Sequence, residues 1–149
     1  MIYTKLTIKA INIAYEAHQG QKDISGVPYI FHPFHVAEQM TDEITVCVAL
    51  LHDVVEDTDV TIEDLAEEFP TEIVEAVRLL THRDGDDYRE YIKNICANPV
   101  ALTVKLGDIE HNMDESRLCD KTPEIEKKLA HWRRKYSEAK KIIEEEINS

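Results

Sequence analysis

The stretch VCVALLHDVVED, residues 46–57, decides the fold of this chain, because an apolar run leads directly into a cluster of titratable side chains. Six consecutive apolar residues are typical of a helix that is buried on all sides. On a helix, Glu56 lies one turn beyond His52, and Asp57 lies one turn beyond Asp53. An imidazole and three carboxylates would then share a small volume, where unpaired charge is costly to bury. A bound cation would stabilise this cluster and leave carboxylates for proton transfer, so the stretch predicts a metal-dependent hydrolase.

Helical periodicity extends over the rest of the 149 residues, and no segment alternates polar and apolar residues as a strand would. Thr61 with Asp64 resembles a capping box, and Asn98-Pro99 is a typical start of a helix. We expect helices at about 6–17, from His32-Pro33 with Pro33 in the first position, at 43–55, from Thr61, and at 73–80, 88–97, 100–113 and 123–147. The predicted fold class is all-α: a compact single-domain helical bundle over residues 1–149. Its motif-bearing core is expected at about 14–113, followed by an amphipathic C-terminal helix at about 123–147.

Composition and charge limit the partners that we expect for this chain. No apolar run is long enough to span a bilayer, and the N-terminus lacks a signal-peptide pattern. Three scattered cysteines without a CxxC spacing are typical of reduced thiols, which favours a cytoplasmic protein. The net charge of −13 would repel nucleic-acid backbones and anionic membranes, so we expect no DNA, RNA or membrane partner. An anionic small-molecule substrate would need a metal and a few local cations in order to bind.

Two further segments supply candidate metal ligands. On the predicted helix 100–113, Lys105, Asp108 and Asn112 are spaced by three and four residues and form one polar stripe. His32 precedes a proline, which biases its backbone toward the extended region at a loop–helix junction. The candidate ligand set combines two imidazoles and two carboxylates: His32, His52, Asp53 and Asp108. This set suits an octahedral ion such as Mn²⁺ or Fe²⁺ with positions left open, whereas structural zinc prefers a closed tetrahedral shell, usually with cysteine.

Three strings of sequence carry a resemblance to a known family. They are GVPYIFHP at residues 26–33, LHDVVEDT at 51–58 and KLGDIEHNM at 105–113. His32, His52-Asp53 and Asp108 match the H…HD…D pattern of the HD phosphohydrolase superfamily. Within that superfamily, the chain resembles the hydrolase domain of RelA/SpoT-type alarmone enzymes from about residue 14 to residue 113. It is similar to the stand-alone small alarmone hydrolases.

The resemblance implies a reaction and roles for several residues. The reaction is hydrolysis of the 3′-pyrophosphate of guanosine 3′,5′-bis(diphosphate)-type alarmones, which releases pyrophosphate and GDP or GTP, with Mn²⁺ as cofactor. Glu56 and Asp57 match the residues that assist the attacking water. Asn112 matches a residue that helps to hold the nucleotide, and Tyr29 and Lys105 match positions near the substrate.

One departure from the family keeps other substrates open. Asp23-Ile24 stands where the long enzymes carry an Arg-Lys pair whose arginine packs on the guanine base, with Lys22 just before it as a candidate substrate contact. A carboxylate can neither stack on a base nor attract phosphate. The alternatives are an HD phosphohydrolase acting on another nucleotide, such as a nucleoside phosphate or the 2′-phosphate of NADPH, and a non-catalytic nucleotide sensor. Retention of all four ligands together with Glu56 and Asp57 argues against the sensor.

A few other residues receive structural interpretations. We interpret His18 as a packing or hydrogen-bonding residue and His111 as structural or exposed. Trp132 and Tyr136 on the last predicted helix are interpreted as core anchors.

Overall fold

The computed structural model describes residues 1–149 and consists of helices joined by loops, without β-strands. The all-α prediction is therefore confirmed. The elements in chain order are α1 (Lys5–Ala17), α2 (Phe31–Glu38), α3 (Glu43–Leu51), α4 (Val54–Asp57), α5 (Ile62–Glu68), α6 (Thr71–Leu80), α7 (Tyr88–Cys96), α8 (Pro99–Asn112), the 3₁₀ turn η1 (Glu115–Arg117) and α9 (Pro123–Ile147). No helix combines the length and the apolarity that a membrane span requires.

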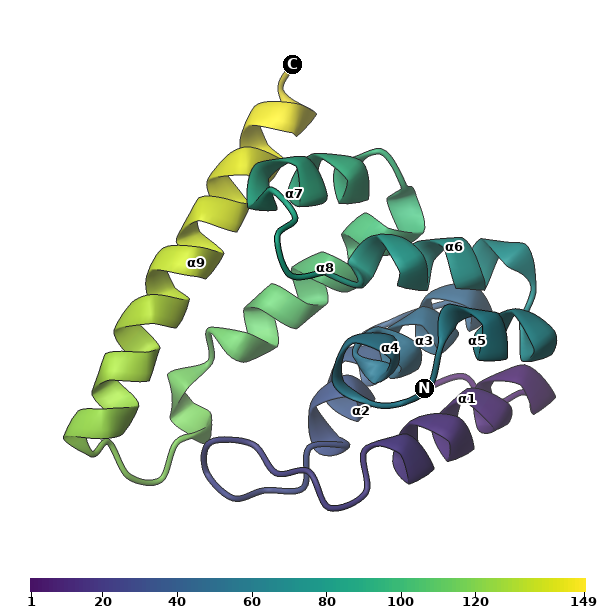
Figure 1. Cartoon of the computed structure of the whole chain (residues 1–149), viewed down its shortest axis with the longest axis horizontal. Helices are drawn as coiled ribbons and strands as arrows, with labels where there is room; N and C mark the ends of the chain where they lie inside the picture. The colour runs from purple at the N-terminus through teal and green to yellow at the C-terminus, as the bar shows by residue number, and fades with distance from the viewer.

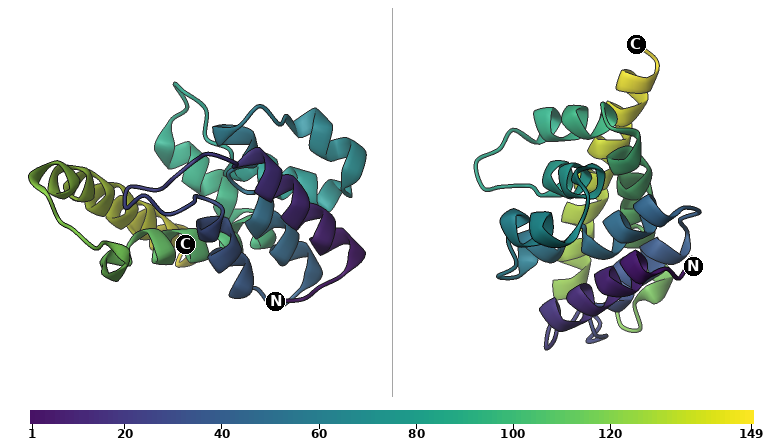
Figure 2. Two further views of the ribbon diagram at one scale, coloured as in Figure 1. Left: turned by 90° about the horizontal axis from the view of Figure 1, so that it is seen from below. Right: turned by 90° about the vertical axis from the view of Figure 1, so that its right-hand side faces the viewer.

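Helix α3 forms the centre of the bundle (Figures 1 and 2). It begins at Asp42, whose side chain accepts a hydrogen bond from the backbone N–H of Thr45 and so caps the helix. Every residue of the apolar run 46–51 is fully buried. Helices α1, α2, α6 and α8 pack around α3, which explains why this helix is apolar on all sides.

The predicted continuous helix over 43–55 is wrong at its C-terminal end. Helix α3 ends at Leu51, His52 and Asp53 lie in a turn, and α4 begins at Val54. Asp53 has φ −104° and ψ −3°, which breaks the helical path. Neighbouring side chains on a straight helix point about 100° apart, whereas the break turns the side chains of His52 and Asp53 toward the same point.

Helix α2 also begins differently from the prediction. It starts at Phe31, so Pro33 occupies the third position of the helix and not the first. The first-turn N–H groups have no partner within the helix, so a proline is tolerated there as well. The predicted starts at Asn98-Pro99 and at Thr61 are confirmed, the latter as a capping box with Asp64.

Helix α9 lies along one side of the bundle and packs against α7 (Figure 1). Its bounds, Pro123–Ile147, agree with the predicted C-terminal helix. The segment through η1 connects the end of α8 to the start of α9, and it lies beside the loop that joins α1 to α2 (Figure 2). These parts of the chain enclose the cavity described below.

Candidate metal centre

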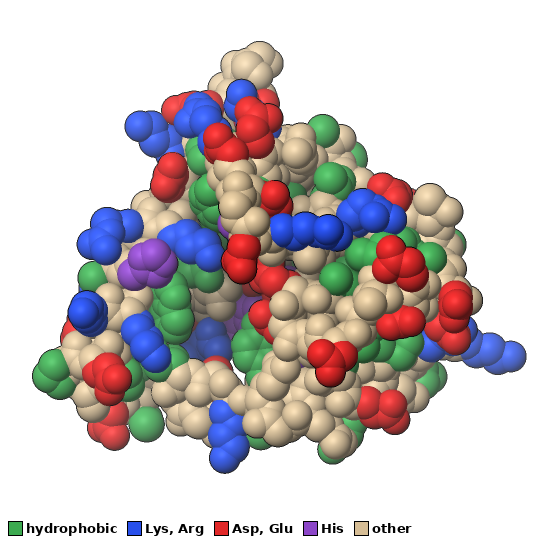
Figure 3. All heavy atoms as spheres, viewed as in Figure 1, with side chains coloured by type: hydrophobic (Ala, Val, Ile, Leu, Met, Phe, Trp, Pro, Cys, Tyr) green, Lys and Arg blue, Asp and Glu red, His purple; other side chains and the backbone are tan.

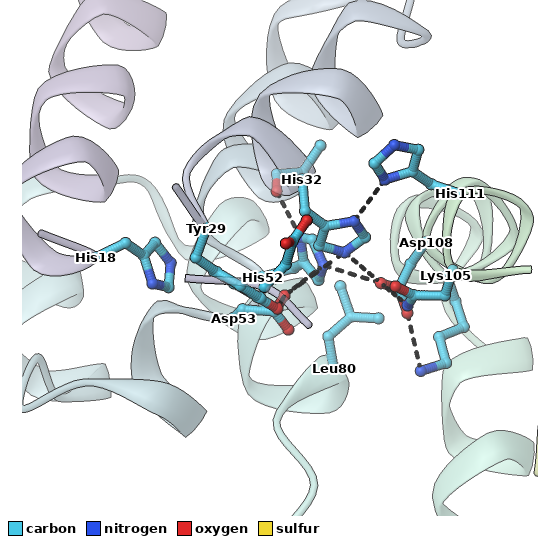
Figure 4. Close-up of polar contacts among 12 residues, drawn as sticks. His18, Tyr29, His32, His52, Asp53, Leu80, Lys105, Asp108 and His111 are labelled. Carbon is cyan, nitrogen blue, oxygen red and sulfur yellow. Dashed lines mark hydrogen bonds and ion pairs between the residues drawn. The ribbon is translucent and has the colours of Figure 1, made fainter. Parts of the chain in front are cut away.

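The structure brings together the four side chains that were predicted as metal ligands (Figure 4). The Nε2 atom of His32 lies 2.9 Å from Oδ1 of Asp108 and 3.7 Å from Oδ2 of Asp53. The Nε2 atom of His52 lies 3.3 Å from Oδ1 of Asp108 and 3.1 Å from Oδ2 of Asp53. One donor atom from each of the four residues therefore lies within 4.8 Å of all the others.

The spacing and the chemistry of these donors fit a divalent ion. Around an octahedral ion with bonds of roughly 2.1 Å, neighbouring donors lie about 3 Å apart and opposite donors about 4.2 Å apart. The distances between the imidazole nitrogens and the carboxylate oxygens fall in this range. The set contains two nitrogens, two oxygens and no sulfur, which is typical of a hard or borderline divalent metal.

Both candidate histidine ligands are fixed through their other ring nitrogen. His52 Nδ1 lies 2.5 Å from the carbonyl oxygen of Ala49 and donates to it. His32 Nδ1 lies 2.7 Å from Nδ1 of His111, whose ring in turn stacks on His35 at 4.0 Å. Burial, followed by the charge of Arg117, lowers the pKa of His111 to about 4, so its ring is neutral and its Nδ1 can accept a hydrogen bond from Nδ1 of His32. With Nδ1 of each candidate ligand as the donor, the Nε2 atom of the neutral ring has its lone pair directed at the centre.

The two carboxylate ligands are held in the same way. The hydroxyl of Tyr29 donates to Oδ2 of Asp53 at 2.6 Å. Asp108 accepts hydrogen bonds from the side-chain amide of Asn112 at 3.0 Å and from the ammonium of Lys105 at 3.3 Å. Three residues that were predicted near the substrate thus contact a ligand directly.

The electrostatics of the cluster suit a bound cation. Burial lowers the pKa of His52, but Asp53 and Asp108 together outweigh burial and raise this pKa well above its usual value. Burial raises the pKa of Asp53, but His52 and His32 together outweigh burial and bring it down to about 2. Burial likewise opposes ionisation of Asp108, yet Lys105 and the two histidines hold its pKa well below the usual range. Two buried carboxylates that remain ionised beside two imidazoles would bind a divalent cation.

Glu56 and Asp57 extend from the ligand cluster on α4. Carboxylate oxygens of Asp53, Glu56 and Asp57 lie within 4.8 Å of one another. Burial raises the pKa of Glu56, although the backbone N–H of His82, 2.7 Å from Oε1, opposes the rise. Burial also raises the pKa of Asp57. Carboxylates with raised pKa values beside a metal centre are suited to proton transfer.

The centre opens into a cavity of about 490 Å³. Figure 3 shows it as a hollow with histidine at its base, Lys and Arg on the side nearest α9, and Asp and Glu on the opposite side. We call the side built by the four ligands with Glu56 and Asp57 the ligand wall. The opposite side comes from the α1–α2 loop, η1 and α9, and three acidic residues also line it: Asp23, Asp114 and Glu115. We call five other residues of this side the cationic wall: Lys22, Arg117, Lys128, Trp132 and Lys135.

Two aromatic residues of α9 correct or extend the sequence interpretation. Trp132 lines the cavity and is absent from the hydrophobic core, so its interpretation as a core anchor is wrong. Tyr136 packs against the core and also lines the cavity. The helical spacing of Lys128, Trp132 and Lys135, which places them on one face of α9, was the signal that could have identified this wall. Arg117 lies in η1, which no periodicity predicted.

Comparison with known families agrees with this geometry. Residues 10–87 match the HD domain family, and this span includes His32, His52 and Asp53. The chain belongs to the HD domain family. The fourth candidate ligand, Asp108, follows the matched span, so its convergence with the HD pair is shown by the geometry alone.

Curated relatives of this HD domain are longer proteins. The chain is 34% identical over 145 residues to "Probable GTP pyrophosphokinase" of Mycobacterium leprae, with 83% of this chain and 18% of that protein covered. It is 33% identical over 147 residues to "Bifunctional (p)ppGpp synthase/hydrolase SpoT" of Escherichia coli K12, with 83% and 21% covered. The HD domain thus spans about a fifth of the length of the curated relatives that it matches.

One solved structure matches the HD domain over nearly its whole length. Its title is "A metazoan ortholog of SpoT hydrolyzes ppGpp and plays a role in starvation responses". The match has a TM-score of 0.72 and 26% identity, and it covers 93% of this chain and 87% of the other. These relatives confirm the resemblance to RelA/SpoT-type alarmone enzymes.

Proposed function

We propose that the protein hydrolyses the 3′-pyrophosphate of guanosine 3′,5′-bis(diphosphate)-type nucleotides and releases pyrophosphate and GDP or GTP. The observation that carries this proposal is the convergence of four metal-ligand atoms, with Glu56 and Asp57 beside them, at the base of one cavity. The names of its relatives, which include SpoT-type hydrolases, support the same reaction.

We propose Mn²⁺ as the cofactor, with Fe²⁺ or another octahedral divalent ion as a substitute. His32, His52, Asp53 and Asp108 would hold it through the Nε2 and Oδ atoms that face one another. When bound, such an ion supplies Lewis acidity that polarises the phosphoryl group under attack.

The acids on α4 would carry the proton transfers. Oε1 of Glu56 is occupied by the backbone N–H of His82, so Oε2 remains to accept a proton from the attacking water. Because burial raises the pKa values of Glu56 and Asp57, either carboxyl can hold that proton and pass it to the leaving group. The hydroxyl of Tyr29 would keep the carboxylate of Asp53 directed at the metal position during these steps.

Donors on α8 would position the phosphate under attack. The ammonium of Lys105 is buried and paired with Asp108. Burial lowers its pKa, but Asp108 and the neighbouring tyrosines together outweigh burial and raise it, so the ammonium stays protonated. Two of its three N–H groups remain for phosphate oxygens, and Asn112 offers a second amide N–H.

Cations on the opposite wall would bind the remaining phosphates. Lys22, Lys128 and Lys135 are exposed at the cavity and form no ion pair with a carboxylate. In a chain with a net charge of −13, these local cations are needed to attract a polyanionic nucleotide.

A second candidate function keeps the same chemistry with another nucleotide. Asp23 lines the cavity at the place where the family resemblance implies an arginine, which favours a substrate other than the guanosine alarmones. A nucleoside phosphate and the 2′-phosphate of NADPH are the alternatives.

Product analysis tests the two functions directly. Purified, Mn²⁺-loaded protein is incubated with guanosine tetraphosphate, and the products are separated by anion-exchange chromatography. Pyrophosphate and GDP in equal amounts are expected. Release of single phosphates, or faster turnover of NADPH or nucleoside phosphates in a parallel panel, would support the second candidate instead.

A further inference from the structure

Arg117 is held in a fixed position on the cationic wall. Its Nη1 donates to the carbonyl oxygen of His111 at 2.9 Å, and its Nη2 lies 3.5 Å from Oδ2 of Asp23. The side chain is only 28% exposed, although it lines the cavity. Two acceptors from different parts of the chain therefore fix the edge of one guanidinium group.

Asp23 is itself fixed as the partner of Arg117. Its Oδ1 accepts hydrogen bonds from the backbone N–H groups of Ser25 at 2.8 Å and Val27 at 3.0 Å. Both lone pairs of Oδ1 are thereby used, and Oδ2 is left for the guanidinium. The ion pair joins the α1–α2 loop to η1, and both of its residues line the cavity.

This arrangement makes Arg117 different from the other cations of the wall. Asp23 balances its charge and its N–H edge is partly occupied, so it is a poorer phosphate ligand than the unpaired lysines. The faces of the planar group remain as its binding surface, and guanidinium planes stack on nucleobases. Apolar cavity residues follow both partners in the chain, Ile24 after Asp23 and Leu118 after Arg117.

We propose that Arg117 is a specificity-determining residue whose guanidinium face receives the nucleobase. It would give the cavity a preference for nucleotides over sugar phosphates, while the lysines bind the phosphates. The inference rests on the proposed function in one respect, namely that the substrate is a nucleotide.

Binding of two matched probes tests this role without any turnover. GMP and ribose 5-phosphate differ only in the base, so the ratio of their dissociation constants measures what the base contributes. We expect Arg117→Ala in the Mn²⁺-loaded protein to weaken GMP binding about tenfold, the effect of losing one stacked base, and to leave ribose 5-phosphate binding unchanged. Trp132, the only tryptophan, lines the same cavity and provides a fluorescence signal beside calorimetry.

Two further variants separate the base from the phosphate. Arg117→Lys keeps the charge but loses the plane, so GMP binding should be as weak as in Arg117→Ala. Lys121→Ala is the matched control, because Lys121 is an exposed cation of the same segment that pairs with Glu115 but does not itself line the cavity. It should bind both probes normally. Circular dichroism melting curves establish that each variant is folded.

Three results would overturn the proposal. They are an unchanged affinity ratio in Arg117→Ala, an equal loss for both probes that Arg117→Lys restores, and a loss of the same size in Lys121→Ala. Failure of the proposed function is distinguishable, since protein that binds GMP with this ratio but releases no pyrophosphate from guanosine tetraphosphate loses only the hydrolase proposal.

Discussion

The ligand wall and the cationic wall face the same cavity, but they hold their functional groups in different ways. On the ligand wall, each candidate metal ligand makes a second contact that orients it, as the hydroxyl of Tyr29 does for Asp53. On the cationic wall, Lys22, Lys128 and Lys135 are exposed and form no ion pair, and only Arg117 is held by hydrogen bonds. Lys135 lies over the rings of Tyr88 and Tyr136. The difference separates a rigid centre for the chemistry from an adaptable surface for the rest of the substrate.

The largest effect is expected from removing a ligand, with Asp108→Ala as the test. Asp108 is 6% exposed and accepts from Asn112 and Lys105, so its loss leaves a buried ammonium without a partner. We expect loss of bound metal, loss of all measurable turnover and a destabilisation of about 3–5 kcal/mol. Metal analysis and urea denaturation measure these effects.

The exposed Asp120 provides the control for that experiment. Asp120→Ala removes a carboxylate that forms no ion pair, so metal content and stability should remain as in the unchanged protein. Retention of one equivalent of metal by Asp108→Ala would contradict the ligand assignment.

The next largest effect is expected from Glu56→Gln, which separates proton transfer from metal binding. Glu56 is exposed at the cavity and belongs to the carboxylate group beside Asp53. General acid–base catalysis contributes about 10²–10⁴-fold, so kcat should fall by that factor while metal content is unchanged. Glu67→Gln on the exposed face of α5 should leave kcat unaltered. A kcat within threefold of normal in Glu56→Gln would show that another group handles the proton.

A smaller effect is expected from His111→Ala, which removes the support behind His32. Loss of such a partner typically weakens metal binding 10–100-fold. Turnover should therefore fall at limiting Mn²⁺ and recover when the metal is saturating. The matched control is His131→Ala, since His131 is exposed on α9 outside the cavity lining. Equal metal affinity in His111→Ala and the control would mean that His32 binds the metal without support from His111.

The raised pKa of His52 gives the metal centre a pH dependence. In the metal-free protein, a raised folded-state pKa stabilises the fold below the unfolded value of about 6.5, and this stabilisation is lost as pH rises through the folded pKa. Metal binding requires neutral imidazole, so the stabilisation from the metal grows over the same interval. At 100 times Kd it amounts to about 2.7 kcal/mol. The melting temperature, measured by calorimetry with and without Mn²⁺, should rise more on metal addition at high pH than at low pH. An equal rise at both pH values would contradict this prediction.

The ligand wall was predictable from the sequence because its residues lie in short, chemically distinctive strings. His52-Asp53 follows an apolar run, and Asp108 lies on a polar stripe of one helix. The turn that breaks α3 was not predictable, since Val54-Val55 continue the apolar pattern and only the tertiary position of the ligands requires the break. The contact between His111 and His32 joins residues 79 positions apart, which no local pattern encodes.

The cationic wall was harder to predict, and the reason is physical. Exposed lysines on an amphipathic helix predict a solvated face, and the sequence pattern is the same whether or not a cavity lies beside them. The pairing of Asp23 with Arg117 changes the interpretation of Asp23. From the sequence, its carboxylate is expected to repel phosphate, whereas in the structure it holds a guanidinium group in place. This role of Asp23 depends on a contact between residues 94 positions apart, which no local sequence pattern encodes.

The smallest effect is expected from Lys128→Ala, which tests whether the cationic wall acts through loosely placed charge. Lys128 lines the cavity, is exposed and has no carboxylate partner. An exposed charge is screened, so KM should rise only about two- to threefold, kcat should stay constant, and the difference should shrink at high salt. The neighbouring Lys127 is also exposed but does not line the cavity, so Lys127→Ala should leave KM unchanged. A tenfold loss that persists at high salt would instead place Lys128 in a fixed contact with the substrate, and the contrast between the two walls would then be wrong.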